Sequence, residues 1–165
     1  MAALRAPGRH YSFVSRWTLP ASAERCWAEI ERMLKPAAAG VSWWPGVALV
    51  EPPEALRAGE RMMLVVRSPL GYRLRVHLTI TDVIPGRSIA AASHGDLRGS
   101  GLLEVIPDAS NVDAGGAASI VFHWDVATER RWMNATAFAL RPVFQHAHAS
   151  VMRTGERGLV RALEG

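Results

Sequence analysis

Short segments with a two-residue hydrophobic repeat fill most of the chain, and one long segment with a helical repeat follows them. In the clearest short segment, 72–81, the apolar residues Tyr72, Leu74 and Val76 alternate with polar residues. This alternation predicts a β-strand with one buried and one wetted face. Because turn residues separate most of these segments, they indicate an antiparallel meander and not alternating strands and helices. The other predicted strands are 11–19, 47–51, 61–67, 88–93, 99–106 and 119–126.

The helical repeat predicts a long amphipathic helix over 132–163, with its apolar residues on one face. Pro142 removes one backbone N–H and is expected to kink or interrupt this helix. A shorter helix is predicted over 23–34, where Ser22 is a suitable N-cap, and a second short helix or a turn is expected within 36–45. These elements together predict a single α+β domain.

The predicted sheet is wider than the helix that must cover it. A helix is about 10 Å across, and six or seven strands spaced about 4.8 Å apart span nearly three times that width. The sheet is therefore expected to curl around the helix. Space left between them is expected to form an apolar cavity for a small molecule, since sites of that kind are concave and largely apolar.

The candidate cavity residues lie on the inward faces of the predicted elements. Of the adjacent Trp43 and Trp44, one indole is expected in the core and the other at a cavity mouth. Gly155 lies in mid-helix, where glycine costs about 1 kcal/mol relative to alanine, so either a close backbone approach or room for a guest is expected there. The candidates are Trp17, Trp44, Tyr72, Leu74, Val76, Phe122, Trp124, Phe144, His148, Val151, Met152 and Gly155.

Composition limits the classes of partner. The net charge of +4 suggests nucleic acid or an anionic membrane, but the basic residues are scattered singly or in pairs and Lys35 is the only lysine. The basic residues are therefore expected to lie singly on the solvated surface, and no nucleic-acid partner is predicted. No apolar run approaches the roughly 20 residues that cross a bilayer, and no stable membrane insertion is expected. With Cys26 as the only cysteine, neither an internal disulfide nor a cysteine-based metal site is expected.

The chain is expected to comprise a tail, 1–9, and one ligand-binding domain, 10–165. Residues 1–9 lack the apolar segment and cleavage site of a secretory signal, so a cytoplasmic location is expected. A monomer or a homodimer is expected.

Four stretches of the sequence resemble the START-like (SRPBCC) superfamily, in its polyketide cyclase/dehydrase-like branch. They are 17–21 leading to Trp27, the turn 43–47, the glycine-containing 95–101, and 148–153 with Gly155, Gly158 and Leu159. The resemblance covers nearly the whole chain. It implies a helix-grip fold, in which a curved antiparallel sheet wraps a long C-terminal helix and two short helices follow the first strand.

The resemblance implies a cavity but no single reaction. The superfamily includes lipid and sterol carriers, plant hormone receptors, quinone-binding proteins and aromatase/cyclases, and its members share no catalytic motif. The first hypothesis is therefore binding of a small hydrophobic or aromatic molecule, such as a lipid, a quinone or a polyketide-like compound. The alternative is an enzyme of aromatase/cyclase or dehydratase type. An interaction module would instead have a cavity too small for any guest.

The histidines are the remaining candidates for proton transfer or metal binding. His148 is on the buried stripe of the long helix, where it either exchanges a proton with a bound carbonyl or hydroxyl or is a core histidine with a protein partner. His94 and Asp96 lack a third ligand, so a turn capped by Asp96 is favoured over a metal site. His77 and His123 lie on polar strand faces and are expected to be solvated. No metal and no cofactor are predicted.

Overall fold

The computed structural model describes residues 10–35, 42–109, 116–128 and 131–165, with residues 131–140 described by their backbone alone. The expected tail 1–9 lies outside the described residues. So do residues 36–41 of the second short helix or turn expected within 36–45, and the described residues 43–46 form a bend and a turn.

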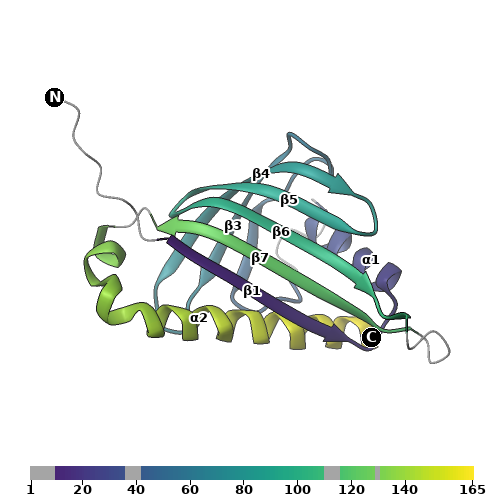
Figure 1. Ribbon diagram of the computed structural model, residues 1–165. Coiled ribbons are helices and arrows are strands. Elements are labelled where there is room, and N and C mark those ends of the chain that lie inside the picture. Colours follow the sequence, from purple (N-terminus) through teal and green to yellow (C-terminus); the bar gives the residue numbers. More distant parts are fainter. Residues whose placement is uncertain (1–9, 36–41, 110–115, 129–130) are drawn as a thin grey trace.

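Seven strands form one antiparallel sheet in the order β1-β7-β6-β5-β4-β3-β2 (Figure 1). All sequential strands from β2 to β7 are neighbours, and β1 pairs with β7 at the edge opposite β2. The expected antiparallel meander is thus confirmed. The strands are β1 (His10–Leu19), β2 (Val47–Glu51), β3 (Arg61–Arg67), β4 (Arg73–Ile84), β5 (Ser88–Gly95), β6 (Leu97–Pro107) and β7 (Ala118–Thr128).

Helix α1 (Ala23–Leu34) follows β1 and covers one end of the sheet (Figure 1). Its N-cap is Ser22, whose Oγ accepts a hydrogen bond from the Arg25 N–H at 3.4 Å, and Glu24 in the first turn complements the helix dipole. The fully buried Cys26 faces the core, and burial raises the pKa of its thiol to about 11. Cys26 therefore packs as a small apolar group.

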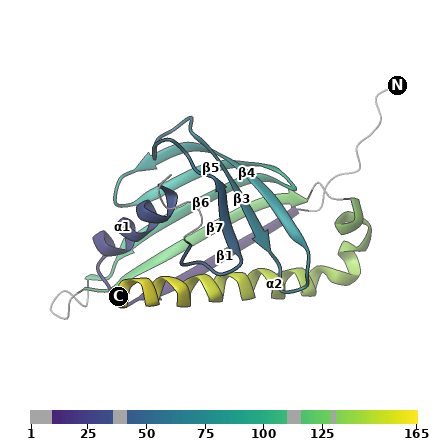
Figure 2. The same cartoon turned by 180° about the vertical axis from the view of Figure 1, so that it is seen from behind.

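Helix α2 (Arg131–Glu164) is the long C-terminal helix, and the strands curve over it (Figures 1 and 2). The helix continues through Pro142, and both views show it bent in its N-terminal third. Farther along, Glu156 accepts a hydrogen bond from the Thr18 N–H at 3.0 Å, which joins α2 to the end of β1. Its buried residues include Met152, Leu159 and Leu163.

The main core lies between the concave face of the sheet and the two helices. Trp17 and Leu19 from β1 meet Val76 and Ile80 from β4 in this cluster, although the two strands are far apart in the sheet. Strands so far apart share one core only because the sheet curls, as its width relative to the helix predicts. The helix-grip architecture is thus confirmed. No helix in the described part of the chain is long and apolar enough to span a membrane.

Candidate functional site

A cavity of about 250 Å³ lies inside the curl of the sheet. Side chains from α1, α2 and all seven strands line it. Most of the sequence-predicted candidates are brought together here. Those that line the cavity are Trp44, Tyr72, Leu74, Val76, Phe122, Trp124, Phe144, His148, Val151 and Met152.

Trp17 and Gly155 do not belong to the lining. Trp17 is only 2% exposed, because its ring packs against Phe122 at 4.5 Å and Trp44 at 5.0 Å between centroids. A Cβ on Gly155 would lie 2.5 Å from two atoms of the Trp44 indole. Gly155 therefore permits a close approach of helix and indole, and it does not provide room for a guest.

Trp43 and Trp44 form a parallel stack in the cavity wall, with centroids 5.8 Å apart and ring planes 5° apart. The Trp44 Nε1–H donates to the Val151 carbonyl at 2.9 Å, and the Trp43 Nε1–H donates to the Glu29 carbonyl at 3.4 Å. The expectation of one core indole and one cavity indole was wrong, since both rings line the cavity. The turn at 42–46 orients both rings the same way and binds them to α1 and α2.

Tyr11 and Phe13 from β1 add an aromatic group that sequence reasoning did not single out. Their rings stack at 5.9 Å, and the Tyr11 ring meets the edge of Phe144 at 6.5 Å. Tyr72 meets Phe144 at 6.1 Å from the other side. Both missed residues lie on the same strand face as Trp17, so the alternation in β1 contained the signal that would have found them.

His148 lies in the cavity wall at this aromatic group. Its ring stacks on Phe13, with centroids 4.1 Å apart and planes 16° apart, and its Nε2 is 3.4 Å from the Ser15 Oγ. Burial disfavours the charged imidazolium and lowers the pKa of His148 to about 4. The ring is therefore neutral near pH 7. His148 has a protein partner, as expected of a core histidine, and it also lines the cavity, where proton exchange with a bound molecule stays a prediction.

The other polar residues singled out in the sequence lie away from the cavity or have partners. Asp96 accepts a hydrogen bond from the Arg75 N–H at 2.8 Å, which fits the expected turn after the positive-φ Gly95. His77 and His94 are exposed, and half-buried His123 contacts Glu104 at 3.2 Å. In the described parts of the chain, no three His, Cys, Asp or Glu residues are grouped to hold a metal ion.

No protein-family model and no curated protein match the chain. Solved structures do. The Zhui aromatase/cyclase from a Streptomyces species has a TM-score of 0.66 at 17% identity over 94% of each chain. A Thermus thermophilus protein, TTHA0849, has a TM-score of 0.62 at 16% identity over 92% of this chain and 99% of that one.

A further structure is that of Ms6760 from Mycobacterium smegmatis, with a TM-score of 0.59 at 16% identity over 96% of this chain and 97% of that one. At these identities the likeness concerns the fold, and it extends over nearly the whole of each protein. The chain therefore has the helix-grip, polyketide cyclase-type fold of the START-like proteins that its sequence resembles.

Proposed function

We propose that the protein binds a small hydrophobic or aromatic molecule in the cavity between sheet and helix. The observation that carries this proposal is the cavity itself, about 250 Å³ within a wall that is largely aliphatic and aromatic. Ligand sites in proteins have this character, an apolar concave surface with a few polar groups. An interaction module with a filled interior is disfavoured by the same observation.

Native mass spectrometry of freshly purified protein tests the proposal. We expect a co-purified molecule, released on unfolding, whose mass and fragmentation identify it as lipid, quinone or polyketide-like. The matched control is Ala91→Leu, which adds bulk to the cavity wall and should lower the bound fraction. A wild-type protein that neither carries a guest nor binds any apolar aromatic probe would contradict the proposal.

A second candidate function is a cyclase or dehydratase that uses the same cavity. The likeness to an aromatase/cyclase favours it, and His148 places an imidazole in the cavity wall. A neutral imidazole can take a proton from the carbon beside a carbonyl group and return it to an oxygen. In this candidate function the cavity folds a flexible chain and His148 moves the proton.

The variant His148→Gln separates the two functions. If the protein is an enzyme, product formation from a polyketide-like substrate should stop while the substrate still binds. If it is a binding protein, no product forms from the wild type, and only affinity changes. Unaltered affinity and unaltered turnover in this variant would exclude His148 from both roles.

A single domain over 10–165, a cytoplasmic location and a monomeric or homodimeric state complete the proposal. Light scattering during size-exclusion chromatography measures the mass of the assembly. Cell fractionation measures the location. A larger assembly, or recovery from the membrane fraction, would contradict these parts without affecting the cavity.

A further inference from the structure

The cavity wall contains no acidic side chain and no basic side chain other than histidine in the described part of the chain. The polar members include one serine, one threonine, two tyrosines and two histidines. Of the histidines, His123 contacts the Glu104 carboxylate at 3.2 Å, and burial lowers the pKa of His148 to about 4. An anionic guest would therefore find no lysine or arginine in the wall, and the His123 ring already faces a carboxylate.

The basic residues of the lining strands point to solvent. On β4, Arg73 and Arg75 are exposed, whereas Leu74 and Val76 between and beside them line the cavity. Strand alternation sends these side chains to opposite faces of the sheet. The arginines of the described strands thus lie outside the cavity, and a buried carboxylate would lose its hydration without gaining an ion pair with them.

His148 supplies a hydrogen-bonding group in this wall. One ring nitrogen, Nε2, is 3.4 Å from the Ser15 Oγ, and Nδ1 has no hydrogen-bond partner within the residues that the structure describes. The Ser15 hydroxyl can donate or accept, so either tautomer of the ring is compatible with that contact. Nδ1 is accordingly able to donate to a carbonyl or to accept from a hydroxyl.

Cavity size restricts the guest further. The volume of about 250 Å³ lies below the roughly 300–1,000 Å³ usual for pockets that hold drug-sized ligands. A lipid with two acyl chains does not fit such a volume. The stacked rings of Phe13 and His148 and those of Trp43 and Trp44 provide flat walls, which favour a compact ring system.

We infer that the guest is a compact, uncharged ring compound with a neutral hydrogen-bonding oxygen, and that His148 binds this oxygen. This inference rests on the proposed function and narrows it. It excludes fatty-acid carboxylates and other anions from the lipids, quinones and polyketide-like compounds considered above. It makes His148 a specificity-determining residue whether or not a reaction follows.

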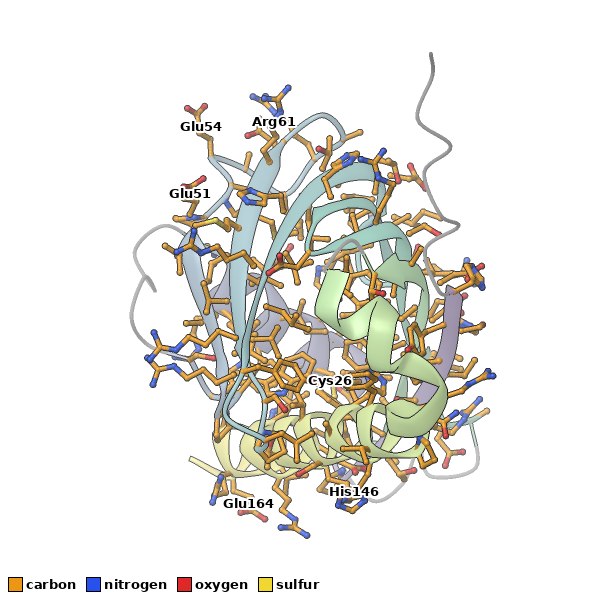
Figure 3. The ribbon with its side chains drawn as sticks, turned by 90° about the vertical axis from the view of Figure 1, so that its left-hand side faces the viewer. Cys26, Glu51, Glu54, Arg61, His146 and Glu164 are labelled. Carbon is orange, nitrogen blue, oxygen red and sulfur yellow. The ribbon has the colours of Figure 1, made fainter. Side chains whose placement is uncertain are left out.

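Three naphthalenes with the substituent at one ring position test the inference. Acetylnaphthalene has a neutral carbonyl, naphthoate has a charged carboxylate, and ethylnaphthalene has no oxygen. Isothermal titration calorimetry measures their affinities for the wild type, His148→Phe and His148→Gln. The control is His146→Phe, because His146 is exposed and points away from the sheet on the outer side of α2 (Figure 3).

The wild type should bind acetylnaphthalene about fivefold more tightly than ethylnaphthalene, as expected for one hydrogen bond, and at least tenfold more tightly than naphthoate. In His148→Phe the preference for acetylnaphthalene over ethylnaphthalene should disappear, while ethylnaphthalene still binds. His148→Gln should retain part of the preference, and His146→Phe should match the wild type.

Two results would overturn the inference and leave the proposed function standing. One is a wild type that binds naphthoate most tightly. The other is a preference for acetylnaphthalene that survives in His148→Phe, whose folding is checked by a cooperative thermal transition. Failure of the wild type to bind any of the three probes would instead count against the proposed function itself.

Discussion

At the scale of the residue, His148 is unusual because it is a titratable group buried among apolar and aromatic neighbours in the cavity wall. Its neighbours Phe13, Phe144 and Met152 offer no charge to stabilise an imidazolium, and desolvation alone lowers its pKa to about 4. In the unfolded chain the same group titrates near 6.5. The difference links the protonation of His148 to the stability of the fold.

We expect the free energy of unfolding to fall as the pH drops through this range. Between pH about 6.5 and about 4 the unfolded state takes up a proton on His148 and the folded state does not, so acid favours unfolding. From pH 7 to pH 5 the loss due to this group is about 1–2 kcal/mol. Urea unfolding at both pH values measures it.

His148→Phe is the matched variant for that experiment, since it retains a ring against Phe13 and cannot titrate. Its loss of stability between pH 7 and pH 5 should be smaller than that of the wild type by the same 1–2 kcal/mol. His146→Phe should behave like the wild type, because His146 is exposed. Equal pH dependence in all three proteins would show that His148 titrates normally in the folded state.

At the scale of the element, hydrophobic periodicity predicted which segments form strands and helices. It did not predict how deep in the core each inward-facing residue lies. The strict alternation of β4 and the uniform spacing of α2 made both elements predictable. Trp17 and Gly155 were placed on the correct inward faces, yet they pack against Trp44 and not against the cavity. An inward-facing residue lines the cavity only where two elements, far apart in the sequence, leave space between them. No local sequence pattern contains that distance.

Glycine substitutions in α2 test how closely this helix approaches the tryptophan turn. Alanine at an exposed helical glycine would gain up to about 1 kcal/mol from helix propensity. A Cβ at Gly155 would instead lie 2.5 Å from the Trp44 indole, and one at Gly158 would overlap the Trp43 carbonyl oxygen. Gly155→Ala should therefore destabilise the protein by about 1–3 kcal/mol, and Gly158→Ala by more, because a backbone atom cannot swing away.

Urea denaturation of both variants, with Arg157→Ala as the control at an exposed position of the same helix, measures these changes. Gly155→Ala should also alter the fluorescence of Trp44, whose indole N–H bonds the Val151 carbonyl on α2. Stability equal to or above that of the wild type in Gly158→Ala would mean that α2 lies farther from the turn.

At the scale of the whole molecule, the void follows from the widths of its parts. A sheet of seven strands that curls around one helix and is closed at one end by another leaves space that side chains only partly fill. The existence of a cavity was predictable from the sequence for this reason. The outward direction of Arg73 and Arg75 was predictable too, because it follows from the alternation in β4. The environment of His148 was not, because its contact with Phe13 depends on how closely α2 approaches β1.

Filling the cavity should lower the affinity for a ligand and raise the stability of the fold. Ala91 on β5 is buried in the cavity wall, and Ala90 beside it faces the other side of the sheet. Ala91→Leu places three further carbons against the apolar cavity wall, which should raise the free energy of unfolding by about 1–2 kcal/mol. The same carbons occupy the room of a guest, so the affinity for ethylnaphthalene should fall. Ala90→Leu should change neither quantity appreciably.

An Ala91→Leu protein that is less stable than Ala90→Leu and still binds the probe would show that the space is not a preformed binding cavity.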